Sequence, residues 1–199
     1  MLKMPLTFIV LISLIQGLTE FLPVSSSGHL ALIPVFTPLN YQGKILDVAA
    51  HIGTLIAVTF YLRTEIIVIV SALCNRGRSD PINARLGVLL VLATLPVAVA
   101  GYFVNYANWI WMDMVQTLAL ANFGFAVLLW LSDRVTIKKQ GLDSVTWLPA
   151  LLIGIAQICA LIPGASRSGV TISAARFLGY DRITAARLSL LLSLPTIAG

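Results

Sequence analysis

Long stretches without a charged side chain are the feature that most constrains the fold of this chain. Residues 86–112, 114–132 and 144–166 contain no Asp, Glu, Lys or Arg. A helix that crosses the hydrocarbon core of a bilayer needs about 20 mainly apolar residues. Charged residues make up only 11% of the chain, against about 25% in soluble domains. We therefore expect an all-α integral membrane protein, and we exclude a soluble globular domain, a disordered chain and a free nucleic-acid binder.

The apolar segments predict where the chain crosses the membrane. Transmembrane helices are expected over residues 46–74, 84–104 and 114–131, and a further one over 184–199. Arg63 and Glu65 fall inside the first of these segments. A helix over 46–74 would be about 43 Å long and would project beyond the hydrocarbon. We therefore place both charged residues near one end of it.

Two shorter apolar segments run into polar sequences that contain Gly and Pro. We call residues 23–29 (PVSSSGH) the first elbow and residues 163–169 (PGASRSG) the second elbow. Each elbow lies between an apolar helix and a short apolar piece, which predicts helix hairpins over 5–36 and 147–178. Non-helical backbone at membrane depth is tolerated only inside protein or beside a wet cavity. We interpret both hairpins as re-entrant and expect the two elbows to share one polar site.

The two hairpins match each other at an offset of about 141 residues. The matching pairs are Gln16 with Gln157, Ser25 with Ser166, Ser27 with Ser168, and Gly28 with Gly169. Three spans between the hairpins would bring the second one in from the opposite face, as in an inverted-topology repeat. Residues 1–131 then form repeat one, residues 132–146 a cytoplasmic loop, and residues 147–199 an incomplete repeat two. A full second repeat would reach roughly residue 272, so we expect a C-terminally truncated bundle.

The distribution of Lys and Arg predicts the orientation, because loops rich in these residues face the cytoplasm. If the first hairpin enters from outside, most of the basic residues lie on the inner side: Arg76, Arg78, Arg85, Arg134, Lys138, Lys139, Arg176, Arg182 and Arg187. Only Lys3 and Lys44 then lie on the outer side. We therefore expect the first hairpin to enter the membrane from the outer side.

Ionisable groups at membrane depth are rare and usually functional. The first hairpin carries Glu20 and His29, and the second carries Arg167. Gln16 and Glu20 are four residues apart and share one helix face, which leads into the hydroxyls of the first elbow: Ser25, Ser26 and Ser27. These groups provide a carboxylate, an imidazole and several candidate nucleophiles.

The second elbow has the composition of an anion receptor. Ser166, Arg167, Ser168 and Thr171 stand at the start of a helix, where free N–H groups and the positive dipole end favour anions. The Arg fork matches phosphate oxygens. Three glycines in the elbows let backbone approach a ligand closely: Gly28, Gly164 and Gly169. An anion receptor, a nucleophile and a proton acceptor are the parts that phosphoryl transfer requires.

Structural roles explain several of these residues as well. Helix capping accounts for Ser25 and Ser27, and Arg167 is also explained by an ion pair with Glu20 and no ligand. Asp47 is expected to cap the helix over 46–74. His51 is expected to be a buried hydrogen bonder.

Three motifs resemble the undecaprenyl-diphosphate phosphatase (bacitracin-resistance) family. Residues 16–29 (QGLTEFLPVSSSGH) are similar to its first signature, residues 163–171 (PGASRSGVT) to its second, and residues 47–54 (DVAAHIGT) to the segment between them. The resemblance covers the whole chain. The first position of the family motif is often Glu, whereas this chain has Gln16, and family members are longer.

The resemblance implies an enzyme of the bacterial inner membrane that hydrolyses undecaprenyl diphosphate on the outer face. Its product, undecaprenyl phosphate, is the recycled carrier of peptidoglycan synthesis, and the family is linked to bacitracin resistance. By this likeness Ser26 is the nucleophile, His29 an acid/base or alternative nucleophile, Glu20 the activator, and Arg167 the diphosphate clamp. The divalent cation, Mg²⁺ or Ca²⁺, would be bound by Gln16 and Glu20. Other partners expected are membrane lipid and a second copy in a homodimer.

Two competing hypotheses remain open from the sequence. Inverted repeats with broken helices are also a transporter architecture, so the chain is alternatively a flippase for an anionic polyprenyl lipid. The other alternative is an inactive, truncated family member.

Overall fold

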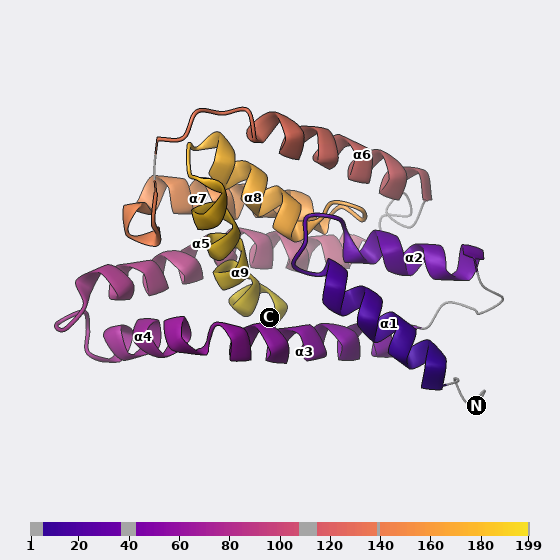
Figure 1. The fold of residues 1–199 in the computed structure, drawn as a ribbon, viewed down its shortest axis with the longest axis horizontal. Coiled ribbons are helices and arrows are strands. Elements are labelled where there is room, and N and C mark those ends of the chain that lie inside the picture. The colour runs from indigo at the N-terminus through magenta and orange to yellow at the C-terminus, as the bar shows by residue number, and fades with distance from the viewer. Residues whose placement is uncertain (1–5, 37–42, 108–114, 139, 199) are drawn as a thin grey trace.

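The computed structural model describes residues 6–36, 43–107, 115–138 and 140–198. These residues form helices joined by turns, without a strand, in agreement with the expected all-α class. In Figure 1, α3 and α4 lie along one side of the molecule, α6 lies along the opposite side, and α8 and α9 lie between them. The helices in chain order are α1 (Leu6–Thr19), α2 (Ser26–Phe36), α3 (Lys44–Tyr61), α4 (Arg63–Cys74), α5 (Pro81–Ala107), α6 (Val115–Ser132), η2 (Leu142–Ser144), α7 (Trp147–Ala156), η3 (Gln157–Leu161), α8 (Arg167–Phe177) and α9 (Arg182–Ala198).

The first hairpin is the pair α1 and α2. Their facing residues form a small apolar core of Phe8, Ile12, Leu30 and Ile33. The second expected hairpin appears as α7, the short 3-10 helix η3, and α8. Both elbows therefore connect two helices, and in each the second helix begins inside the elbow.

The segment expected as one straight span over 46–74 is divided into α3 and α4, which are bent by 78°. Leu62 lies between them with non-helical backbone angles, and its side chain is buried in the main core. Arg63 turns back over the Phe60 ring, and its Nη1 donates to the Phe60 carbonyl at 3.0 Å. Glu65 accepts from Arg187 of α9 at 2.9 Å. Arg63 and Glu65 thus stand at the bend and not at the end of a straight helix, which corrects the sequence expectation.

Two of the described helices are long and apolar enough to cross a membrane, and the bent pair α3–α4 would be a third. The two are Pro81–Val104 within α5 and Val115–Ser132, which is α6. They confirm apolar helices at the spans expected over 84–104 and 114–131. The segment expected over 184–199 is α9, which has 17 residues and packs largely inside the molecule.

The main core lies where α5, α7, α8 and α9 meet. Its most enclosed side chains are Leu89, Ile153, Tyr180, Leu191 and Leu192. α7 approaches α5 closely because Gly154 has no Cβ; a methyl group there would stand 2.8 Å from the Cα of Ala93. This packing holds α7, and through it the second elbow, in a fixed position.

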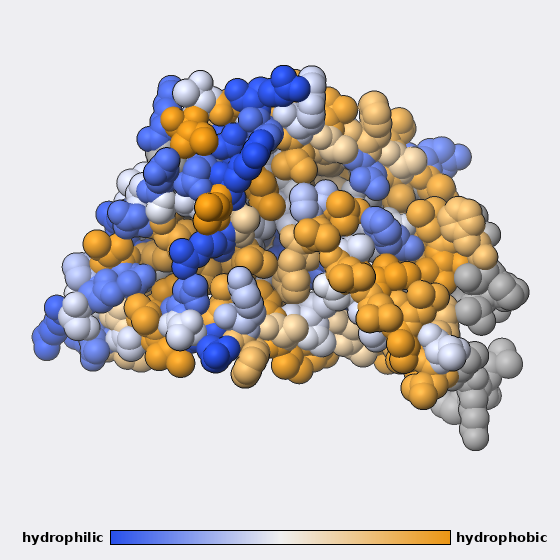
Figure 2. Space-filling view, in the orientation of Figure 1, coloured by the Kyte–Doolittle hydropathy of each residue, from blue (hydrophilic) through white to orange (hydrophobic). Residues whose placement is uncertain are grey.

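The surface separates hydrophilic and hydrophobic regions. Figure 2 shows hydrophilic residues gathered toward the end that carries the α4–α5 turn, and mostly hydrophobic residues around α1 and α2. Many large apolar side chains are exposed, among them Ile45, Phe36 and Phe123, which fits a surface covered by lipid. At the hydrophilic end Arg182 Nε donates to Asp133 at 2.8 Å, and this hydrogen bond lowers the pKa of Asp133 below its ordinary value.

Candidate active site

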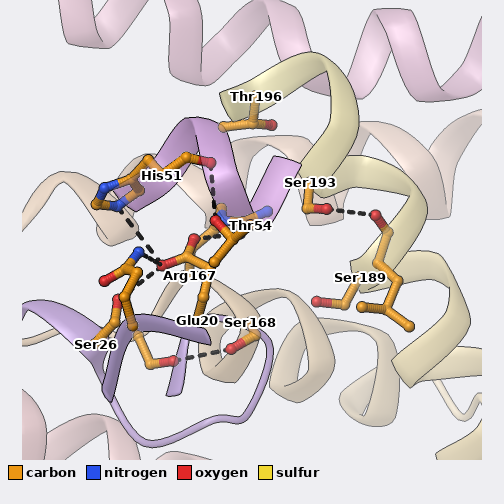
Figure 3. Close-up of polar contacts among 12 residues, drawn as sticks. Glu20, Ser26, His51, Thr54, Arg167, Ser168, Ser189, Ser193 and Thr196 are labelled. Carbon is orange, nitrogen blue, oxygen red and sulfur yellow. Dashed lines mark hydrogen bonds and ion pairs between the residues drawn. The ribbon is translucent and has the colours of Figure 1, made fainter. Parts of the chain in front are cut away.

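The Glu20 carboxylate is the centre of the polar cluster. Glu20 follows α1, and its backbone N–H still donates to the Gln16 carbonyl at 2.9 Å. Its Oε2 accepts from Gln16 Nε2 and from Ser26 Oγ, each at 2.8 Å. Its Oε1 accepts from Arg167 Nη2 at 2.8 Å. Figure 3 shows Ser26 and Arg167 converging on this carboxylate, whose side chain is only 7% exposed.

The two donors occupy corresponding positions of the two elbows. α2 begins at Ser26 and α8 begins at Arg167, and these positions differ by the expected offset of 141. A helix N-terminus presents unpaired N–H groups and a positive dipole end. One carboxylate therefore lies where the first residues of two helices meet, which is a setting that favours an anion.

The same capping bonds recur in both elbows. Ser25 Oγ accepts from the Gly28 backbone N–H at 3.2 Å, and Ser166 Oγ accepts from the Gly169 backbone N–H at 3.2 Å. The Ser25 hydroxyl also lies 3.2 Å from that of Ser27, and the Ser166 hydroxyl lies 3.0 Å from that of Ser168. The capping interpretation of Ser25 is confirmed.

Hydrogen bonds also join the second elbow to Leu22, just before the first elbow, and the start of α8 to α9. Ser168 is buried, and its Oγ donates to the Leu22 carbonyl at 2.8 Å. Thr171 is buried too, and its Oγ1 donates to Ser189 of α9 at 2.7 Å. Both hydroxyls are thus engaged in holding the elbows and α9 together.

A cavity of about 590 Å³ opens beside Glu20. Glu20 and the two elbows contribute mainly polar residues to its lining: Glu20, Ser25, Ser26, Ser27, Ala165, Ser166 and Arg167. α3, η3 and α9 contribute apolar residues together with three polar ones: Val48, Ile52, Ala160 and Ile197, with Asp47, His51 and Thr196. A ligand in this cavity would therefore contact hydroxyls, charged side chains and hydrocarbon.

The two histidines lie in different surroundings. His29 is exposed, and its Nδ1 lies 2.8 Å from the Ser25 carbonyl. His51 lines the cavity, and its Nε2 lies 3.6 Å from Glu20 Oε2. Its side chain is 40% exposed, so it is not the buried hydrogen bonder that the sequence suggested.

Asp47 lines the same cavity. It is not the cap of α3, because the helix begins at Lys44 and Gly43 is the capping residue. Asp47 and His51 are four residues apart on an otherwise mainly apolar helix, and this spacing is the sequence signal that could have placed both at the site.

Two of the three glycines expected to approach a ligand, Gly28 and Gly164, lie beside helix α6, whereas a Cβ on Gly169 would meet Ser166 and Pro23. A Cβ on Gly164, whose φ is +93°, would stand 2.9 Å from the Cα of Leu118. A Cβ on Gly28 would stand 3.5 Å from Asn122 Nδ2. A substrate contact at these glycines, at Ser168 and at Thr171 stays a prediction.

The cation expected at Gln16 and Glu20 has few protein ligands available. Among the described residues, no three His, Cys, Asp or Glu side chains gather around one point. Gln16 is fully buried, and its Oε1 has no hydrogen-bond partner. Mg²⁺ is commonly held by one or two carboxylates together with substrate phosphates. The donor set here fits a cation of that kind, whose remaining ligands arrive with a phosphate.

Comparison with known proteins decides the family. The family model described as bacitracin resistance protein BacA matches residues 9–199. The chain belongs to this family. Among its relatives, the undecaprenyl-diphosphatase of Roseobacter denitrificans is 43% identical over 199 residues, which are 98% of this chain and 74% of that protein. Undecaprenyl-diphosphatase 1 of Rhodospirillum rubrum is 46% identical over 200 residues, which are 96% of this chain and 71% of that protein. Membership of the BacA family confirms the sequence resemblance and, together with the apolar helices, a membrane protein.

Proposed function

We propose that this protein hydrolyses undecaprenyl diphosphate to undecaprenyl phosphate and inorganic phosphate, as the names of its relatives indicate for them. The observation that carries the proposal is the meeting of Ser26 and Arg167 at one buried carboxylate, inside a cavity lined by both polar and apolar residues. A hydroxyl, a guanidinium and a carboxylate in contact are the groups needed to transfer a phosphoryl group. The apolar part of the lining fits a lipid substrate.

In this proposal Ser26 attacks the terminal phosphorus of the diphosphate. The Ser26 oxygen forms the new O–P bond, its proton passes to Glu20 Oε2, which already accepts that hydrogen bond at 2.8 Å, and the bond to undecaprenyl phosphate breaks. Water then hydrolyses the phosphoserine and releases phosphate. Arg167 binds the non-bridging oxygens, where a planar fork of donors offsets the developing charge.

The arrangement in the membrane is also part of the proposal. The matching caps at Ser25 and Ser166 support two re-entrant hairpins related as an inverted repeat, with the site near the midplane. We place the protein in the bacterial inner membrane with the first hairpin entering from outside, because most basic residues then lie on the inner side. We take the outward opening of the cavity from the family resemblance. The liberated carrier lipid would re-enter peptidoglycan synthesis. A homodimer remains our expectation for its assembly.

The test is phosphate release from a polyprenyl diphosphate by the detergent-purified chain. Arg167→Ala is expected to lower the rate by about 100-fold, the usual cost of removing a donor that stabilises transition-state charge. Arg63→Ala is the matched control, because Arg63 is exposed, stacks on Phe60 and is not among the residues that line the cavity; its rate should stay within about twofold of the unmutated chain. Undiminished release by Arg167→Ala would refute the clamp.

The same preparation tests the carrier alternative. Ser26→Ala should abolish phosphate release if Ser26 is the nucleophile. A flippase needs no nucleophile, so lipid translocation in liposomes that survives Ser26→Ala, with no phosphate release from the unmutated chain, would favour the carrier.

A further inference from the structure

The hydrogen bonding of His51 fixes which ring nitrogen faces the cavity. Its Nδ1 lies 2.7 Å from the Asp47 carbonyl. A carbonyl oxygen only accepts, so Nδ1 carries the hydrogen that forms this bond. Nε2 is therefore the nitrogen with a free lone pair when the ring is neutral, and it is the atom on the side of Glu20. A ring held through one N–H by a backbone carbonyl, with the other nitrogen open, is the usual arrangement of a metal-binding histidine.

The distance between His51 Nε2 and Glu20 Oε2 fits the same arrangement. At 3.6 Å the two atoms are too far apart for a good hydrogen bond. Two ligands that each lie about 2.1 Å from one cation are about 3.4 Å apart at a tetrahedral angle and about 3.0 Å apart at an octahedral one. The two atoms would therefore have to approach by only about 0.2 to 0.6 Å to share a cation.

We propose that His51 Nε2 and Glu20 Oε2 are the two protein ligands of the divalent cation, and that diphosphate oxygens and water complete its coordination. The proposal rests on the proposed function, because the diphosphate supplies the missing ligands. The carboxylate then divides its two oxygens between the two positive groups: Oε1 binds Arg167, and Oε2 binds the cation beside the Ser26 hydroxyl whose proton it accepts in the proposed reaction. Gln16 has a different task from the one expected, because its Nε2 donates to Oε2 and orients it.

The ligand set indicates which cations suit the site. One carboxylate and one imidazole, with phosphate oxygens, suit Mn²⁺ or Zn²⁺ better than Ca²⁺, which takes oxygen ligands. Replacing His51 by Gln removes the nitrogen and leaves an oxygen donor. His51→Gln should therefore weaken Mn²⁺ binding by about tenfold or more, and Ca²⁺ binding by much less.

The decisive measurement is the nitrogen coupling in pulsed EPR spectra of bound Mn²⁺. The chain contains two histidines, His29 and His51, so a tag-free preparation in detergent with Mn²⁺ and inorganic diphosphate offers two candidate imidazoles. We expect a ¹⁴N coupling that is present in the unmutated chain, retained in His29→Gln and lost in His51→Gln. A coupling that is lost in His29→Gln, or absent from the unmutated chain, overturns the proposal.

A second measurement keeps the proposal testable if the His51→Gln variant does not fold. Growth of the unmutated chain with ¹⁵N-histidine must replace the ¹⁴N coupling by a ¹⁵N coupling, and an unchanged spectrum overturns the proposal. Phosphate release is measured separately on the same sample. Release without nitrogen coupling refutes the ligand assignment alone, whereas coupling without release supports the cation site and refutes the proposed function.

Discussion

The Glu20 carboxylate supports the fold and also occupies the place where an anion would bind. The substitution Glu20→Gln tests both roles. Gln keeps the size of the side chain but removes the charge that Arg167 contacts at 2.8 Å, and it replaces one of the two accepting oxygens with a donating amide nitrogen. The pair is largely buried, with 7% of the Glu20 side chain and 14% of the Arg167 side chain exposed. Removing one partner of a buried pair costs about 3–5 kcal/mol, because the remaining charge is left uncompensated. We expect the lower end, about 3 kcal/mol, since the hydrogen bonds survive in part.

The assay is thermal unfolding in detergent, with and without inorganic diphosphate. For a chain of 150–250 residues each kcal/mol shifts the unfolding temperature by about 2–4 °C, so Glu20→Gln should unfold about 6–12 °C below the unmutated chain. An anion that replaces the lost carboxylate should recover part of this shift, by about 2.7 kcal/mol at a concentration 100 times its Kd. The unmutated chain should gain much less, because Glu20 already compensates Arg167.

Glu65→Gln is the matched control for this experiment. Glu65 also pairs with an arginine, Arg187, at 2.9 Å, but the two side chains are 31% and 49% exposed. Exposed pairs contribute about 0–1 kcal/mol, so this variant should unfold within a few degrees of the unmutated chain. Equal unfolding temperatures for Glu20→Gln and Glu65→Gln, or equal stabilisation of Glu20→Gln and the unmutated chain by diphosphate, would refute the reasoning.

Two further predictions concern the fold outside the cavity. Gly154→Ala should destabilise the protein by about 1–3 kcal/mol, because the new methyl group would overlap the backbone of Ala93; Gly17→Ala, whose methyl group meets nothing within 4 Å, is the control in the same unfolding assay. The Asp133 carboxylate, with a pKa lowered mainly by its hydrogen bond from Arg182, adds stability above its ordinary pKa of 3.8 and loses it as the pH falls through the lowered value. The unfolding temperature should therefore fall in acid, and Arg182→Gln should flatten that fall; identical acid profiles would contradict the pairing.

The sequence was sufficient for features that depend on composition and local chemistry. Apolar runs identified α5 and α6 as membrane-capable helices, and the hydroxyls and glycines of the elbows identified two helix starts. The cap at Ser25 follows from the same local rules. The ion pair of Glu20 with Arg167 was also open to sequence reasoning, because a charge at membrane depth needs a partner.

Features that depend on packing between distant segments were not predictable in this way. The bend between α3 and α4 occurs at Leu62, and no Pro or Gly at this position predicts it. Just after the bend, Glu65 pairs with Arg187 of α9, which is distant in the sequence. Gly164 looked like a residue near a ligand because only its type is visible in the sequence, whereas α6 is its actual neighbour. The spacing of Asp47 and His51 marks a polar face of α3, but that His51 lies beside Glu20 depends on how α3 packs against α1, which the spacing does not specify.

The correspondence between Ser26 and Arg167 has a consequence for how the site can be varied. The two elbows share their capping bonds and the positions at which their second helices begin. Each elbow therefore presents the side chain at that position to the Glu20 carboxylate, a hydroxyl from one and a guanidinium from the other. In the proposed reaction these two groups divide the tasks of attack and charge neutralisation. The residue types at these two positions thus determine which chemical groups meet at Glu20, while the capping bonds hold the backbone that presents them.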